Sequence, residues 1–356
     1  MKKLWKWAKR LLLFLLVLAA GMAAYLYLQV APLPTGTTAV IKTVLQEPLM
    51  QLEGRTATLD HQGTKVWYEV LDPPAPPKGT VLLVMGISND ALAWPDYFLN
   101  ALREQGFRLI RYDNRGTGMS DWVEDWTEET AYSLEDMAAD GLAILEAEGI
   151  AKAHVMGVSL GGMIAQAMAI QAPEKLHSLT SVMSSAHMAD PEMPPINPSI
   201  LADLLGVSLK YGLFSSESNT IKLQIAARQL LMGEQAYELD TRDIARSVLY
   251  NLRKRRGYND QASQQQVAAT LKSGSRYEGL AQLALPVLVI HGKSDPLIDF
   301  SHGLKTAEMI PHAQTLWLEG MGHDIPPAFL EEIVRALTLH FEKSQAKTLM
   351  DEAANL

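Results

Sequence analysis

Short apolar strand patterns alternate with longer helical patterns along most of this chain, and this alternation constrains the fold more than any other feature. Residues 80–85 form a continuous apolar run, which is typical of a strand buried on both faces of a parallel sheet. Parallel strands need crossover connections, usually helices, so the order predicts a mainly parallel α/β sheet with helices on both faces. Strands are expected at 56–59, 65–71, 80–85, 107–112, 154–157, 178–183, 286–291 and 314–318, and helices at 96–105, 134–148, 160–171, 301–309 and 327–343.

The alternation stops near Ser184 and resumes at Pro286. Residues from about 187 to 280 hold several prolines and then helical patterns without a strong strand. Ligands of open α/β sheets bind at the carboxyl edge of the strands, so we expect this helical insertion to form a lid over that edge. The expected organisation is a linker at 31–55, a catalytic domain at 56–343 that includes the lid, and a C-terminal tail at 344–356.

The first thirty residues have the pattern of a membrane anchor. Lys2, Lys3, Lys6, Lys9 and Arg10 precede an uncharged run from residue 11 to residue 30. Twenty helical residues span about 30 Å, the thickness of the hydrocarbon core of a bilayer. Tryptophans at one end and tyrosines at the other suit the two interfaces, and the positive flank is expected to stay in the cytoplasm. We therefore predict a single-pass transmembrane helix at 1–30, with the catalytic domain on the non-cytoplasmic side, such as the periplasmic face of a bacterial inner membrane.

A cleaved signal peptide is the alternative for the same segment. The charged start, the apolar core at 11–18 and the small residues after it all suit such a peptide, whose removal would release a secreted protein. The apolar pattern continues through residues 25–28, beyond a plausible cleavage point, and this length favours the uncleaved anchor.

The composition argues against some classes of function. The 356 residues carry a formal net charge of −9, which argues against nucleic acid as a partner because that binding needs clustered positive charge. We interpret the one basic cluster, at residues 253–256, as a solvated helix end. The chain has no cysteine, so it has no disulfide, no thiolate metal ligand and no cysteine nucleophile.

One motif points to covalent catalysis. The sequence Gly157-Val158-Ser159-Leu160-Gly161 follows a predicted strand and precedes a predicted apolar helix, which is the setting of a nucleophile elbow. Such a turn needs a strained backbone at the serine and small residues beside it, and the two glycines meet that need. The start of the helix favours negative charge that develops near the serine. Ser159 is therefore the predicted nucleophile.

A serine hydroxyl needs a base that takes its proton, and the chain order in such folds is nucleophile, acid, histidine. Asp295 follows the seventh predicted strand and His323 follows the eighth, so both lie on loops at the carboxyl edge of the sheet. We predict that His323 is the base and that Asp295 orients it. Asp299 and Asp324 are the alternative acids, and His187 is a further candidate for the wall of the pocket.

Acyl transfer also needs backbone N–H donors for the oxyanion of the tetrahedral intermediate. One is expected from Leu160, the residue after the nucleophile, and the other from Ile87 in the loop after the strand at 80–85. Gly86 lets the chain turn inward just before Ile87, and Ser88 or Asn89 could add a side-chain donor.

Several further segments complete a recognisable set: Met85-Gly86, Trp94-Pro95-Asp96, the stretch from Arg111 to Ser120, the turn at 157–162, Asp295 and Gly322-His323. Together they resemble the α/β-hydrolase superfamily, and within it the aclacinomycin methylesterase-like branch of serine hydrolases. The resemblance covers about residues 60–340. It implies a Ser159–Asp295–His323 triad and hydrolysis of an ester without a cofactor.

The expected function is hydrolysis of a carboxylic ester through an acyl-enzyme intermediate, on a small-molecule or lipophilic substrate and with no cofactor or metal. Perhydrolysis and hydrolysis of carbon–carbon bonds use the same triad and stay open as alternatives. A catalytically idle protein of this fold, tethered to the membrane for binding, is the alternative from another class.

Overall fold

The computed structural model of the chain describes residues 2–127, 130–234 and 237–354. At its centre is an eight-stranded sheet with the order β1-β2-β4-β3-β5-β6-β7-β8. The pairs β1–β2 and β2–β4 are antiparallel, and the remaining pairs are parallel. The strands are β1 (Arg55–His61), β2 (Thr64–Leu71), β3 (Gly79–Val84), β4 (Phe107–Tyr112), β5 (Ala153–Val158), β6 (Leu176–Val182), β7 (Val287–Gly292) and β8 (Gln314–Leu318).

The mainly parallel sheet is confirmed, and each strand lies within one or two residues of its predicted ends. The strands of the antiparallel hairpin, β1 and β2, are joined at Gln62 and Gly63, which both have positive φ angles of 52° and 79°. Two-residue hairpin turns favour such angles because their twist matches that of the strands.

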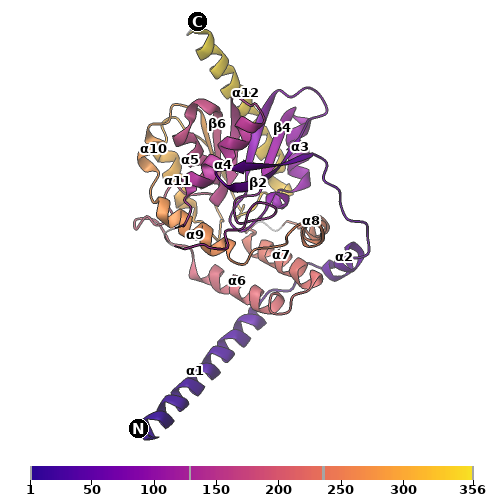
Figure 1. Cartoon of the computed structure of the whole chain (residues 1–356), viewed down its shortest axis with the longest axis vertical. Helices are drawn as coiled ribbons and strands as arrows, with labels where there is room; N and C mark the ends of the chain where they lie inside the picture. The colour runs from indigo at the N-terminus through magenta and orange to yellow at the C-terminus, as the bar shows by residue number, and fades with distance from the viewer. Residues whose placement is uncertain (1, 128–129, 235–236, 355–356) are drawn as a thin grey trace.

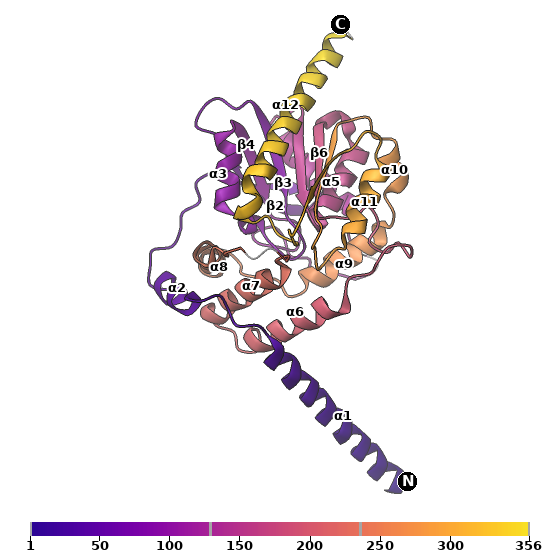
Figure 2. The ribbon, with the colours of Figure 1, turned by 180° about the vertical axis from the view of Figure 1, so that it is seen from behind.

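Helices cover both faces of the sheet, as predicted (Figure 1). Successive residues of β3 show why: Val81 and Leu83 point into one apolar core, and Leu82 and Val84 point into the other. The first core includes α3 (Asp96–Glu104) and α12 (Leu330–Ala354), which lie together in Figure 2. The second includes α4 (Leu134–Ala147) and α5 (Leu160–Gln171), with α11 (Phe300–Met309) at its edge.

A helical insertion connects β6 to β7. It contains α6 (Pro198–Tyr211), α7 (Glu217–Leu231), α8 (Thr241–Lys254), α9 (Ala262–Ser273) and α10 (Tyr277–Ala281). In both views α6, α7 and α8 lie beyond one end of the sheet, on the side away from the C-terminus of the chain. Residues of α7 and α8 line a pocket together with loops that follow β3 and β8, so the insertion lies at the carboxyl edge of the parallel strands.

The N-terminal helix α1 (Lys2–Gln29) projects away from the body of the molecule (Figure 1). Its segment Trp5–Gln29 is long and apolar enough to cross a membrane, a property that signal sequences share. The segment that follows contains α2 (Thr37–Val44). The buried side chains of Ile41 and Val44 in α2 pack against α7 and α8, so this part of the expected linker belongs to the packed body.

The final helix extends beyond the end that the sequence predicted. α12 continues to Ala354 rather than ending near residue 343, and its extension is anchored. The hydroxyl of Ser344 donates to the carbonyl of His340 at 2.6 Å, and the side-chain amide of Gln345 donates to the carbonyl of Lys78 at 2.8 Å. Residues 344–354 are therefore helical in this structure.

His340, in α12, makes the stability of the fold sensitive to acid. Its side chain is buried, and burial lowers the pKa of His340 to about 4, whereas a histidine in an unfolded chain titrates near 6.5. Between about pH 6.5 and pH 4 the unfolded state binds the extra proton, so the stability present above that window is lost as the pH falls through it.

The variant His340→Leu should lose less stability on acidification. Between about pH 7 and about pH 4.5, its free energy of unfolding should fall by about 2 kcal/mol less than that of the wild type. Chemical denaturation of the detergent-solubilised chain measures this. The exposed His312, replaced by asparagine because its φ is 60°, is the control and should behave as the wild type. An equal loss of stability in H340L and wild type would contradict the assignment.

Candidate active site

Ser159 occupies a strained turn between β5 and α5. Its backbone has φ 55° and ψ −123°, a region that residues with side chains rarely adopt. A Cβ on Gly157 would overlap the backbone of Gly161, and a Cβ on Gly161 would overlap the carbonyl of Val84, so both positions require glycine. The N–H of Ser159 donates to the carbonyl of Val182 in β6 at 2.9 Å, which ties the turn to the sheet.

His323 and Asp295 lie in contact on neighbouring loops. The strands β7 and β8 pair in parallel, so the loops that follow them begin side by side. The Nδ1 atom of His323 lies 2.7 Å from Oδ2 of Asp295. The other carboxylate oxygen of Asp295 accepts the N–H groups of Leu297 and Ile298 at 2.8 Å and 2.9 Å. These bonds hold the buried carboxylate against the imidazole ring.

The surroundings of Asp295 favour its ionised form. Burial alone would raise the pKa of Asp295, but the charge on His323 and hydrogen bonds from His291 and His323 outweigh burial and hold the pKa well below its usual range. Because Nδ1 of His323 faces this carboxylate, Nε2 is the ring nitrogen left to act in the pocket that His323 lines.

The alternative acids have other partners. Asp299 caps α11, where one of its carboxylate oxygens accepts both the N–H and the hydroxyl of Ser301. Asp324 follows His323 directly and forms an ion pair with Arg228 of α7. Neither carboxylate has a hydrogen bond to the His323 ring among the described residues.

Two other histidines, His291 and His187, are not among the described residues that line the pocket. The Nε2 atom of His291 lies 3.0 Å from the carbonyl of Ile298 and 3.4 Å from the Asp295 carboxylate, so His291 contacts the loop that carries Asp295. The ring of His187 packs edge-on against Tyr277, and His187 is not among the described residues that line the pocket.

The loop after β3 approaches the serine closely. A Cβ at Gly86 would lie 3.3 Å from the Cβ of Ser159, and Ile87 lines the pocket beside it. Within the described ranges, no backbone hydrogen bond uses the N–H of Ile87 as its donor, and the same holds for Leu160, the first residue of α5. The N–H groups of Ile87 and Leu160 therefore have no backbone acceptor among the described residues.

A residue of the insertion that the sequence did not single out holds this loop in place. The side-chain oxygen of Gln266, in α9, accepts the N–H of Ser88 at 2.8 Å, across 178 positions of sequence. The side-chain amide of Asn89 donates to the carbonyl of Ile87 at 3.0 Å, so it is engaged within the loop. Gln266 carries no local motif, and only the folded insertion brings it to the loop.

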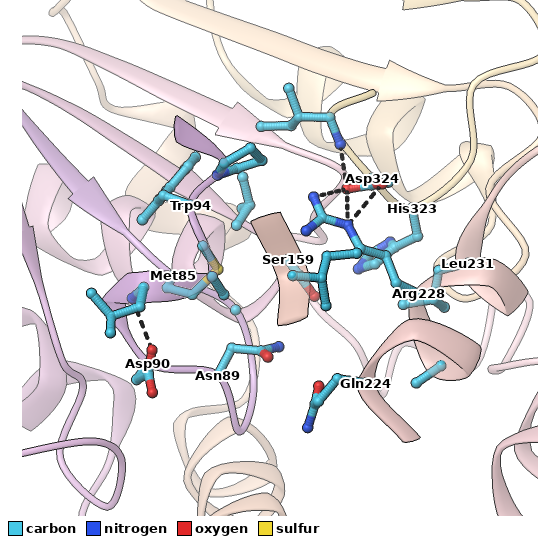
Figure 3. Close-up of a pocket in the computed structure, with 18 of the residues that line it drawn as sticks. Met85, Asn89, Asp90, Trp94, Ser159, Gln224, Arg228, Leu231, His323 and Asp324 are labelled. Atoms are coloured by element: carbon cyan, nitrogen blue, oxygen red, sulfur yellow. Dashed lines mark hydrogen bonds and ion pairs between the residues drawn. The ribbon is translucent and has the colours of Figure 1, made fainter. Parts of the chain in front are cut away.

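Ser159 and His323 line a single pocket of about 220 Å³ (Figure 3). Its walls are mostly apolar and come from the loop after β3, the turn at Ser159, and helices α7 and α8; they include Met85, Trp94, Leu231 and Val248. Such a lining suits an organic substrate with few polar groups. No group of three or more His, Asp and Glu side chains within the part of the chain that the structure describes is arranged to hold a metal ion.

Helix α7 is bonded to the loop that carries His323. The N–H of His323 donates to the carbonyl of Leu231, the last residue of α7, at 2.8 Å. The guanidinium of Arg228 donates to both carboxylate oxygens of Asp324 at 2.8–3.2 Å, as Figure 3 shows. Arg228 is not recognisable from the sequence, because no local pattern links it to a carboxylate 96 positions away.

The loop after β4 connects the segment after β3 to the residue that follows α8. The buried carboxylate of Asp113 accepts the N–H of Ala91 at 2.8 Å and pairs with Arg255, which follows α8. The side chain of Arg255 is only 3% exposed and lies over the ring of Trp67. The interpretation of residues 253–256 as a solvated helix end is therefore wrong for Arg255, because the insertion folds back onto the sheet.

Comparison with protein families agrees with this geometry. The family model described as "alpha/beta hydrolase fold" matches residues 79–327, more than half of the chain. The chain belongs to the α/β-hydrolase fold family. The match begins at β3 and ends in the short helix η3 (Pro327–Phe329), so it includes the turn at Ser159 and the loops that carry Asp295 and His323.

Among curated proteins, this α/β hydrolase is similar to two enzymes named rhodomycin D methylesterase. It is 29% identical over 291 residues to DauP of Streptomyces sp. (strain C5), and the aligned region covers 77% of this chain and 94% of the relative. It is 29% identical over 301 residues to DnrP of Streptomyces peucetius, which covers 80% of this chain and 97% of the relative. These similarities agree with the aclacinomycin methylesterase-like branch.

Solved structures share the fold. A hydrolase from Pseudomonas aeruginosa PA01 matches with a TM-score of 0.58 and 23% identity, over 83% of this chain and 99% of the other. A structure titled as a membrane phospholipase A matches with a TM-score of 0.59 and 19% identity, over 95% of this chain and 99% of the other. At these identities the likeness concerns the fold alone.

The pair of Arg228 and Asp324 gives a test of how α7 is attached. Arg228→Met leaves the largely buried carboxylate of Asp324 without its cationic partner, so the free energy of unfolding should fall by about 3 kcal/mol. The double variant R228M/D324N should lose less than the sum of the two single variants, because the pair is coupled. Denaturation of the four proteins in detergent measures the coupling.

The matched control is Arg253→Met. It breaks the more exposed ion pair with Glu217 and should cost no more than about 0.5 kcal/mol. If R228M lowered the free energy of unfolding as little as R253M does, the ion pair of Arg228 and Asp324 would not be what attaches α7 to the loop.

Proposed function

We propose that this α/β hydrolase cleaves carboxylic esters, with Ser159 as nucleophile, His323 as general base and Asp295 as the residue that orients His323. One observation carries the proposal: the 2.7 Å contact between His323 and the buried Asp295 carboxylate, on a histidine that shares its pocket with the strained Ser159. The similarity to two methylesterases favours a carboxylic ester over other acyl compounds as the substrate.

In the first step, Nε2 of His323 takes the hydroxyl proton of Ser159 as the serine oxygen attacks the ester carbonyl. Asp295 keeps the proton on Nδ1 of His323 and stabilises the imidazolium that forms. Because the pKa of Asp295 lies well below its usual range, its carboxylate is ionised at neutral pH and can perform this role.

The N–H groups of Ile87 and Leu160 are the donors that we assign to the oxyanion. Neither has a backbone acceptor within the described residues, so each can donate as negative charge develops on the carbonyl oxygen. The amide dipoles of α5 point their positive end at the same place.

The intermediate then collapses. His323 returns its proton to the leaving alcohol, which leaves an acyl group on Ser159. A water molecule deprotonated by His323 attacks this acyl group, and the acid is released with Ser159 restored. The helical insertion acts as the lid, since α7 and α8 form the walls that separate this chemistry from bulk water.

We further propose that α1 anchors the enzyme in a membrane and that the hydrolase domain lies on the non-cytoplasmic side. None of the described side chains in the apolar segment of α1 is fully buried in the body, so a bilayer is the environment in which they would be shielded. The basic residues before it favour retention of the N-terminus in the cytoplasm.

The triad gives the first test of this function. Asp295→Asn keeps the size of the side chain but presents the wrong hydrogen-bonding pattern to Nδ1 of His323, so kcat for a p-nitrophenyl ester should fall by about 10⁴-fold. Ser159→Ala should remove nearly all turnover without lowering the thermal midpoint.

The matched controls are Asp299→Asn, on the same loop, and Ser247→Ala, in the wall of the same pocket. Both should keep turnover within about tenfold of the wild type, since neither touches the reacting atoms. Wild-type turnover in S159A would contradict the proposal. A wild-type chain that turns over no ester while folded would favour the idle binding protein.

The anchor gives the second test. After a wash of membranes at high pH, the full chain should stay in the pellet, and its N-terminal peptide should still contain residues 11–30. Protease added to the outside of spheroplasts should digest the hydrolase domain. A mature chain that begins near Tyr25 and is released by the wash would instead support the cleaved signal peptide.

A further inference from the structure

Helix α6 exposes an apolar surface at the end of the molecule from which α1 emerges. Leu201 and Leu205 in α6 are 49% and 52% exposed, and Leu213 and Phe214 in the turn after it are 65% and 79% exposed. We call these four residues the apolar lid face. Surfaces that face water rarely hold a cluster of large apolar side chains unless another molecule covers them.

The face is uncharged along its length. Residues 201, 205, 208 and 212 follow one another at spacings of four, three and four, which places them on one stripe of a helix. The stripe therefore reads leucine, leucine, serine and glycine. The exposed Asp203 lies about 160° around the helix from Leu205 by helical geometry, and Lys210 points to α1 instead.

Helix α6 packs directly against the last turns of α1. A Cβ on Gly206 would lie 2.8 Å from the carbonyl oxygen of Leu26, so glycine permits a close approach of the two helices. The ammonium of Lys210 donates to the carbonyl of Val30 at 3.2 Å and lies 5.6 Å from the centre of the Tyr27 ring. Figures 1 and 2 both show α6 across the end of the body at which α1 emerges.

This contact sets the depth of α6 relative to a bilayer. No charged residue stands between Arg10 and the end of α1 at Gln29, so the uncharged part of α1 spans about 28 Å, close to the thickness of the hydrocarbon core. Val30 then lies at the outer boundary between hydrocarbon and headgroups. Because Gly206 contacts Leu26 and Lys210 contacts Val30, α6 lies at that boundary as well. A tyrosine beside a lysine is a pairing typical of such an interface.

The chain after α1 also forms hydrogen bonds to α7 and α8. The side-chain amide of Gln229 in α7 donates to the carbonyl of Pro32 at 3.2 Å. Arg242 in α8 binds both carboxylate oxygens of Glu47 at 2.6 Å and 2.7 Å. Each of α6, α7 and α8 is therefore tied to the segment that leaves the membrane, and α6 has little freedom to move away from it.

We propose that the apolar lid face is a second membrane contact, inserted among the headgroups of the bilayer that α1 spans. The partner is a phospholipid surface, recognised by apolar burial rather than by charge. The inference rests on the proposed membrane span of α1 and not on the triad. It places the lid, whose helices α6 and α7 pack on each other, between the bilayer and the pocket.

The chain has no cysteine, so a single substitution creates a unique labelling site. Phe214→Cys and Leu205→Cys report on the apolar lid face. Leu339→Cys, 50% exposed on α12, is the matched control on the hydrolase body, and Leu15→Cys in α1 marks the hydrocarbon core. Each full chain is labelled with an environment-sensitive fluorophore and reconstituted into phosphatidylcholine–phosphatidylglycerol vesicles. Some vesicles carry a quencher near the headgroup, and others carry it near the end of the acyl chain.

The labels at 205 and 214 should emit at shorter wavelength than the label at 339 and be quenched at least about twofold more by the shallow quencher, since interfacial helices insert by only 5–10 Å. The label at 15 should respond most to the deep quencher. Thermal midpoints equal to the wild type establish that the variants are folded.

Quenching at 205 and 214 no greater than at 339 would overturn the proposal. A label at 214 that emits at short wavelength without quenching, with dimers formed on oxidation of F214C, would also overturn it by showing a second copy on this face. Absence of quenching at 15 would remove the anchor on which the inference depends. Failure of ester hydrolysis has no effect on any of these readouts, so it is recognised separately.

Discussion

The 2.7 Å contact between His323 and Asp295 depends on the register of two parallel strands, and most of the site depends on that contact. β7 and β8 end together, so the loops that follow them begin as neighbours. Asp295 is held by two backbone N–H groups and supported by His291, which leaves its second oxygen facing the imidazole. The remaining elements position Ser159, the loop after β3 and the pocket wall around this histidine.

The turn at Ser159 stores backbone strain that the packed sheet tolerates. A serine at φ 55° is unfavourable on its own, and it persists because β5 is central in the sheet and α5 is buried against it. Gly157 and Gly161 let the helix approach β3 and β5 closely, where any Cβ would overlap backbone atoms. The result is a hydroxyl presented at the carboxyl edge, which is where ligands of such sheets bind.

The parts of the molecule that the sequence predicted are those with strong local signals. The strands follow continuous apolar runs, and the turn at Ser159 combines glycines with a strand and a helix, so both are visible in a short window. The roles of the insertion are not visible in this way. Arg228, Gln266 and Arg255 act on carboxylates and amides more than ninety positions away, and only the folded chain reveals those partners. Helix α2 has eight residues, too few for stability alone, and exists through its packing on α7 and α8.

The central claim is that Ser159 is an activated nucleophile. Reaction of the full-length protein with a fluorophosphonate, followed by mass spectrometry of its peptides, tests this most directly, because an acyl-transfer serine is phosphonylated only when a base removes its proton. One adduct is expected, on the peptide that contains Ser159, formed rapidly in the wild type and slowly in Asp295→Asn. A folded wild-type chain that carries no adduct on Ser159, or carries it on another serine, would contradict the account.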